Sequence, residues 1–96
     1  MVITMLEAQV APENAAKLES EFKQAVQEME PGIVQTFLVR ASKDPSLWRI
    51  MTVWESRQAL DAMRAASQTP RGVLIFRAAG AEPALSVFEV VGQGKA

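Results

Sequence analysis

Three residue types that carry much of enzyme chemistry are missing from this sequence, which contains no histidine, no cysteine and no tyrosine. Without histidine, the chain lacks the commonest general base and the commonest metal ligand. Without cysteine, it can form no disulfide, no thiolate nucleophile and no thiolate zinc site. Any catalysis must therefore use carboxylates, lysine, arginine, serine or threonine hydroxyls, tryptophan, or the substrate itself.

Neither sign of charge dominates, since ten basic residues stand against eleven acidic ones with no long run of either. A nucleic-acid-binding chain usually carries a basic stripe with aromatic residues between the charges, so no nucleic-acid partner is expected. The longest apolar runs, such as Val73–Phe76, are far too short to cross a bilayer, and no membrane association is expected. The first residues show no basic region ahead of an apolar core, which favours a cytoplasmic protein without a signal peptide.

The length and the apolar content indicate one domain that shares its surface with a partner. A chain of 96 residues fits a single domain, residues 1–96. A domain of this size buries only roughly 60–65% of the surface that its unfolded chain exposes, yet 49% of the residues are apolar. We therefore expect a second subunit to cover part of the apolar surface, and we expect residues 92–96 to form a loose tail.

Hydrophobic periodicity predicts two helices and four strands. Apolar side chains recur every three or four residues over 15–29 and again over 57–67, which is typical of helices with one buried stripe. Alternating apolar side chains predict strands over 1–10, 33–40, 47–55 and 85–91. The run 73–79 stays open between a short helix and an extended segment, because so brief an apolar run has no readable period.

The order strand, helix, strand, strand, helix, strand predicts a ferredoxin-like α+β fold. In this fold a four-stranded antiparallel sheet carries both helices on one face. Strand 33–40 shows that the strands are apolar on both faces: alternation places Ile33, Gln35 and Phe37 on one side and Val34 and Thr36 on the other. The face without helices must then meet another surface, and a second copy of the same sheet is the usual symmetric solution. We therefore expect a homodimer.

The segment 48–63, WRIMTVWESRQALDAM, resembles the signature of the antibiotic biosynthesis monooxygenase domain family. In that family an aromatic residue opens the third strand, a Trp-Glu-Ser-like triplet closes it, and an Ala-Leu-containing stretch follows on the helix. Residues 31–34 resemble the start of its second strand, and residues 42–45 its hairpin turn. The resemblance implies a dimeric α+β barrel with a cavity between each sheet and its helices. It also implies relatives among cofactor-independent, quinone-forming monooxygenases and, more distantly, haem-degrading enzymes.

Two positions depart from the pattern of that family. Met63 stands where the family often has a histidine on the second helix, and Ile50 stands where some enzymes of the family have an asparagine. These departures argue against haem degradation with a histidine ligand. Oxygenation without a cofactor would need a substrate that loses a proton to form an electron-rich anion, and positive groups that stabilise this anion. We therefore expect no cofactor and no metal.

The resemblance and the side-chain chemistry suggest a set of substrate-binding residues: Trp54, Arg77, Met63, Leu60 and Phe76. Trp54 could stack on a planar aromatic substrate or could fill the core beneath the second helix. The methionine and the other apolar side chains suit an adaptable pocket wall, and ordinary core packing is the alternative for most of them.

The arginines near the strands, Arg40, Arg49 and Arg77, could each bind an anionic or enolate substrate through the fixed donors of the guanidinium group. Arg77 ranks first among them, because the resemblance places it in a cavity-lining segment. The alternative for each arginine is a salt bridge at the rim, with Glu7, Glu55 or Glu89 as partner. Trp48 is expected to be structural or to lie at the dimer surface. Glu55 is expected to be a hydrogen-bonding group at the start of the helix, and a base in an apolar pocket is the alternative.

Two functions fit these observations. The first is a homodimeric, cofactor-free monooxygenase that acts on a small aromatic or quinol-type compound. The second is a non-catalytic homodimeric module of the same fold that binds a small molecule or has a structural role. An open cavity beside Trp54 would favour the first function, whereas a cavity closed by Met63, Leu60 and Phe76 would favour the second.

Overall fold

The computed structural model describes residues 1–67 and 69–96 and consists of one sheet and a layer of helices. In chain order its elements are β1 (Val2–Gln9), α1 (Ala15–Ala25), β2 (Ile33–Arg40), β3 (Leu47–Trp54), α2 (Arg57–Ala66), α3 (Arg71–Ala78) and β4 (Ala84–Glu89), with 3-10 turns at Pro12–Asn14 and Val26–Glu28. Each predicted helix and strand is present, with ends that differ by a few residues. None of the described helices is long and apolar enough to span a membrane.

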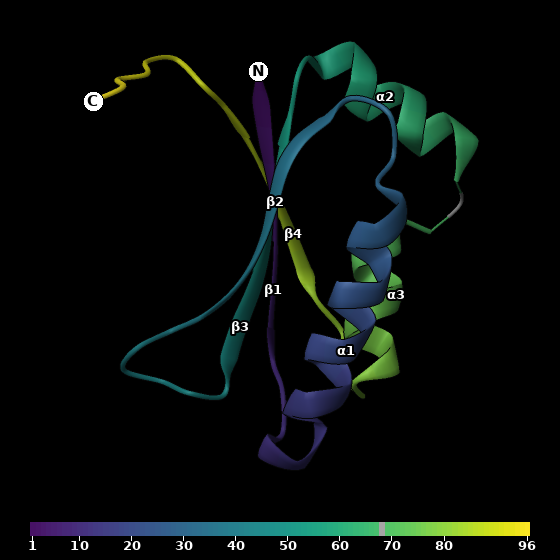
Figure 1. Cartoon of the computed structure of the whole chain (residues 1–96), viewed down its shortest axis with the longest axis vertical. Coiled ribbons are helices and arrows are strands. Elements are labelled where there is room, and N and C mark those ends of the chain that lie inside the picture. The colour runs from purple at the N-terminus through teal and green to yellow at the C-terminus, as the bar shows by residue number, and fades with distance from the viewer. Residues whose placement is uncertain (68) are drawn as a thin grey trace.

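The four strands form an antiparallel sheet in the order β2-β3-β1-β4. This is the ferredoxin-like order, and the predicted α+β fold is confirmed. Figure 1 shows the sheet edge-on, with α1, α2 and α3 on the same side of it. The two inner strands, β1 and β3, come from distant parts of the chain, so the floor beneath the helices combines residues from both halves of the sequence.

The segment that periodicity left open is helical and forms α3. A helix brings Ile75, Phe76 and Ala79 onto one face, and all three are buried. An extended chain would direct the neighbouring Ile75 and Phe76 side chains to opposite faces, and only one of them could reach the core. Burial of both side chains explains the helix, which packs beside α1.

The main core lies between the sheet and the helices α1 and α3. Leu18 and Phe76 are completely buried there, and Trp48 is 5% exposed. The Arg40 guanidinium carbon lies 5.5 Å from the centroid of the Trp48 ring, in the position of a cation–π contact. Of the two places expected for Trp48, the structure therefore shows the core.

Strand β2 contains a β-bulge, so its side chains do not alternate as the sequence predicts. Ile33 pairs with Trp54 and Gln35 pairs with Val53, so Val34 is an extra residue on one strand. Because a bulge lets two residues oppose one, Ile33 turns to the helix side and packs beside Trp54. The prediction that Ile33 and Gln35 share a face is wrong for this reason.

The described helices all lie on one side of the sheet (Figure 1), and we call the other side the open face. Its side chains are largely apolar: Ile3, Met5, Phe37, Val39, Met51, Val53 and Phe88. Phe37 is 46% exposed and Phe88 47% exposed in the single chain. Glu7 and Arg49 form a salt bridge across neighbouring strands on this face, as one of the alternatives for Arg49 predicted. So large an apolar surface is unusual for an isolated subunit.

Candidate functional site

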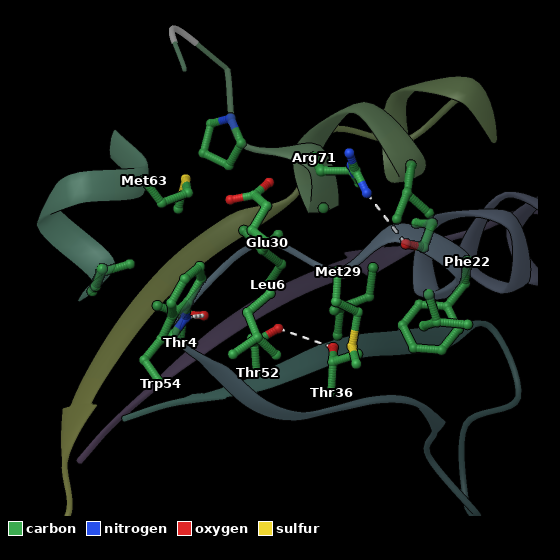
Figure 2. A pocket seen from close by; sticks show the side chains of 18 of the residues that line it. Thr4, Leu6, Phe22, Met29, Glu30, Thr36, Thr52, Trp54, Met63 and Arg71 are labelled. Carbon is green, nitrogen blue, oxygen red and sulfur yellow. Dashed lines mark hydrogen bonds between the residues drawn. The ribbon is translucent and has the colours of Figure 1, made fainter. Parts of the chain in front are cut away.

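A cavity of about 90 Å³ opens between the sheet and the helices, beside the main core. Strands β1, β2 and β3 supply its floor, α2 supplies one wall, and the ends of α1 and α3 supply the other (Figure 2). Most of its lining is apolar and includes Leu6, Phe22, Met29, Ile50, Leu60, Met63 and Ile75. The lining therefore suits an apolar or aromatic molecule whose position is fixed by a few polar groups.

Trp54 forms part of the floor and is held in one orientation. Its side chain is 4% exposed and packs against Leu60 of α2. Its indole Nε1–H donates a hydrogen bond to Thr4 Oγ1 at 3.1 Å, which fixes the plane of the ring. Figure 2 shows the ring at the edge of the cavity, with Thr4 beside it. Both earlier interpretations of Trp54 thus coexist, because the ring contacts the core and borders the cavity.

Two threonine hydroxyls form a second polar element on the floor. Thr36 on β2 and Thr52 on β3 are directly paired across the sheet, and their Oγ1 atoms lie 3.0 Å apart. Both residues line the cavity, and a dashed line in Figure 2 marks the hydrogen bond between them. This pair places hydroxyl groups among aliphatic side chains, where they are the floor's main hydrogen-bonding groups apart from Thr4.

Charged side chains lie at the mouth of the cavity. Glu30 lies between Met63 and Arg71 in Figure 2, and Arg64 of α2 also contributes to the lining. Glu30 is the one acidic residue among the lining residues in the described part of the chain. The lining therefore combines one acidic residue, Glu30, with two arginines, Arg64 and Arg71.

Arg71 also holds the end of α1 in place. Its Nη1 donates a hydrogen bond to the carbonyl oxygen of Ala25 at 3.2 Å and a second one to the carbonyl oxygen of Glu28. These carbonyls belong to the last helical turns, where backbone acceptors have no partner within the helix. The same side chain thus satisfies the end of α1 and brings positive charge to the mouth.

The structure separates the predicted binding residues into two groups. Trp54, Leu60 and Met63 lie at the cavity, and their role in substrate binding stays a prediction. Phe76 is completely buried in the main core. Arg77 lies on the surface and forms a bidentate pair with Glu82, in which both N···O distances are 2.8 Å. Neither Phe76 nor Arg77 lines the cavity, because α3 directs them away from it.

The sequence interpretation missed most of the polar residues of the site. Thr4 and Thr52 were visible in principle, since alternation puts them on the same faces of their strands as Leu6 and Trp54. Glu30 and Arg71 carried no such signal, because they lie in or beside irregular segments that only the tertiary structure brings together.

We expect Arg77→Ala to leave ligand binding in the cavity unchanged and to act only on Glu82. The hydrogen bonds and the positive charge of Arg77 hold the pKa of the Glu82 carboxyl below its usual value. The variant should let the Glu82 pKa rise to the range of an ordinary exposed glutamate, which carboxyl NMR during a pH titration would show. A loss of ligand binding in Arg77→Ala would contradict the placement of Arg77 outside the site.

Comparison with known proteins adds an independent result to this geometry. The sequence profile of the family described as antibiotic biosynthesis monooxygenase matches residues 1–70. The chain belongs to this family. The match includes the strands that form the cavity floor, the helix α2 and the residues Glu30, Trp54 and Met63. No curated protein matches the sequence at a significant level.

Solved structures of the family share the fold along the whole chain. A protein of Deinococcus radiodurans assigned to antibiotic biosynthesis monooxygenases superposes with a TM-score of 0.77 at 16% identity, covering 100% of this chain and 98% of that one. SnoaB, a cofactor-independent oxygenase from Streptomyces nogalater, gives 0.71 at 20% identity, covering 96% and 94%. The haem degrader MhuD from Mycobacterium tuberculosis gives 0.71 at 26% identity, covering 99% and 100%. At identities this low, the first two likenesses establish the architecture only.

Proposed function

We propose that this chain is a cofactor-independent oxygenase of the antibiotic biosynthesis monooxygenase family that acts on a small hydroxylated aromatic or quinol-type compound. The observation that carries the proposal is the cavity beside Trp54, which is apolar inside and has Glu30 and two arginines at its mouth. The similarity to SnoaB, itself a cofactor-independent oxygenase, supports the same reaction class.

The charged groups at the mouth match the two requirements of such a reaction. Glu30 has the right chemistry for a general base that removes a proton from the substrate. Arg64 and Arg71 line the same opening, and their positive charge would stabilise the negative charge that spreads over the ring of the resulting anion. The electron-rich anion then reduces dioxygen, so that one oxygen atom enters the substrate and the other leaves as water.

The similarity to MhuD raises the question whether this chain could bind haem, since that structure holds two haems in its active site. The present chain contains no histidine, cysteine or tyrosine, which are the side chains that most often ligate haem iron. Among the described residues that line the cavity, the side chains with a thioether or a carboxylate are Met29, Met63 and Glu30. This donor set does not fit a histidine-ligated haem.

The proposal is tested by oxygen uptake with anthrone as the substrate, in a buffer without added metal or flavin. We expect uptake to depend on the protein, and we expect one atom of labelled dioxygen in the anthraquinone product. If anthrone and related quinols raise the melting temperature but cause no oxygen uptake, the non-catalytic binding module is the better description. The open cavity is the specific observation that favours binding in that case.

We also propose that two copies of the chain associate through the open face. Phe37, Val39 and Phe88 on this face are 46%, 39% and 47% exposed in the subunit, and a two-fold axis would place the same patch on both sides of the interface. The family supports a dimer. The central position of the face belongs to Met51, which lies between Phe37 and Met5 in the sheet.

Met51→Glu should therefore convert the protein from twice the chain mass to the chain mass, as measured by light scattering at micromolar concentration. The substitution would bury two carboxylates in an apolar interface, which costs several kcal/mol unless they are paired. Ala62→Glu places the same charge on the exposed side of α2 and should leave the dimer intact. A wild-type protein that is monomeric at this concentration would contradict the proposed interface.

A further inference from the structure

The cavity floor contains an ordered row of hydroxyl groups. Thr36, Thr52 and Thr4 are successive cross-strand partners on β2, β3 and β1, so their side chains lie side by side on the helix-facing side of the sheet. All three line the cavity. Neighbouring strands are about 4.8 Å apart, so the row extends for about 10 Å across the floor. We call these residues the threonine row.

The threonine row is enclosed by apolar side chains along the strands. Two residues away along the strands, on one side of the threonine row, lies a cross-strand row of apolar residues: Leu38, Ile50, Leu6 and Leu85. Trp54 lies two residues away on the other side. On β4 the row itself ends at Val87. The hydroxyls thus form a single polar line between an aliphatic surface and an indole ring.

The hydrogen bonds described for the threonine row do not use all of its hydroxyl hydrogens. The Thr36–Thr52 contact uses one of the two hydroxyl hydrogens, whichever residue donates, so the pair keeps one hydrogen to donate. Thr4 accepts a hydrogen bond from Trp54, and its own hydroxyl hydrogen is not used in that bond. At least two O–H groups of the floor can therefore turn to a ligand, and each retains lone pairs that can accept.

The size of the cavity limits how a ligand can use these groups. The enclosed space of about 90 Å³ is smaller than the roughly 150 Å³ of an apolar cavity that holds benzene. A ring must therefore extend into the open mouth, where Met29 is 49% exposed. The oxygen-bearing edge of the ring would meet the threonine row, and its apolar remainder would lie against Leu6, Ile50 and the mouth.

We propose that the threonine row is the specificity element of the cavity: it binds an oxygen atom on the edge of an aromatic ligand and selects oxygenated rings over hydrocarbons of the same shape. This inference rests on the proposed role of the cavity as an aromatic-compound site. It adds the residues that select the substrate, and it assigns them a role in binding that is independent of proton transfer and of dioxygen.

The test compares two probes of the same shape, 1-naphthol and 1-methylnaphthalene, by anaerobic fluorescence or calorimetric titration of the full chain. The wild-type protein should bind 1-naphthol about tenfold more tightly, which is the contribution of one good hydrogen bond. The double variant Thr36→Val/Thr52→Val keeps the shape of both side chains and removes both hydroxyls at once. Because neither partner is left unsatisfied, the variant should fold normally.

In the double variant we expect the preference for 1-naphthol to fall to about twofold or less, while binding of 1-methylnaphthalene stays within about twofold of wild type. Thr69→Val makes the same change at a threonine outside the cavity lining and should keep the tenfold preference. Thr4→Val is less informative, because it leaves the buried indole N–H of Trp54 without its acceptor.

Either of two results would overturn the inference: equal binding of both probes by the wild-type protein, or an undiminished preference in the double variant. Failure of the proposed oxygenase function gives a different pattern, in which the probes are discriminated as expected but no oxygen is consumed with anthrone. The binding and turnover measurements therefore distinguish failure of this inference from failure of the proposed oxygenase function.

Discussion

Replacing Glu30 by glutamine should lower the rate of oxygen uptake with anthrone by about 100-fold, because the amide has the size of the carboxyl group but cannot accept a proton. General-base catalysis by a positioned side chain contributes typically ~10²–10⁴-fold, and the half-exposed position of Glu30 favours the lower end of that range. Affinity for 1-naphthol should change by less than about threefold, because binding depends on the apolar walls and the floor. Steady-state oxygen uptake and titration measure the two effects separately.

Glu13→Gln is the matched control for this prediction, since Glu13 is exposed in the turn that precedes α1, away from the cavity. This variant should consume oxygen at the wild-type rate. A Glu30→Gln variant with full activity would remove Glu30 from the mechanism, and the substrate would then have to lose its proton to water. A decrease that raising the pH reverses would instead support the role of Glu30, because hydroxide can replace a missing base.

Gly32→Ala should lower the melting temperature by about 15 °C, the largest stability effect that we expect from a single methyl group. Gly32 has φ of 90°, a conformation that costs other residues about 1–2 kcal/mol. A Cβ atom there would lie 2.5 Å from the Cβ atom of Ala59, so β2 or α2 would have to shift. Overpacking of this kind costs typically ~1–3 kcal/mol, and 1 kcal/mol corresponds to about 4–8 °C in a domain of this size.

Gly80→Ala separates the two contributions to this effect. Gly80 also has a positive φ, 76°, but its added Cβ would approach only the side-chain nitrogen of Asn14, at 3.2 Å. The variant should lose only about 5 °C in a thermal scan. Combining Gly32→Ala with Ala59→Gly should recover part of the loss, because it removes the atom that causes the clash. If the two glycine variants are equally destabilised, the close approach of β2 to α2 is not important for stability.

The architecture could be predicted from the sequence because the apolar periodicity repeats along the whole length of each helix and strand. The stripe of Leu18 and Phe22 and the alternation of Trp48, Ile50 and Trp54 each repeat a signal several times, so errors at the ends of elements do no harm. The helix α3 stayed open because eight residues hold about two turns, which is too few for a period to be read.

The site was less predictable because it depends on single residues in irregular places. Arg77 ranks first among the arginines because the resemblance places it in a cavity-lining segment, but the helix α3 directs it to Glu82 on the surface. Arg71 reaches the mouth instead, although nothing in its local sequence distinguishes it from Arg77. Ile33 lies on the opposite face of the sheet from the one predicted, because one extra residue in β2 reverses the alternation. A bulge of this kind has no clear sequence signal.

The pairing of β1 with β4 has a consequence for how the chain folds as it is synthesised. Val2 is the register partner of Glu89, so one edge of β1 stays without its neighbour until β4, the last strand of the sheet in chain order, has left the ribosome. Loop-closure entropy makes such distant pairing slow compared with local helix formation. During that interval the exposed backbone edge of β1 and the apolar side chains beside it are available to other nascent chains. The pairing of β4 with β1 is therefore the step that removes this exposed edge.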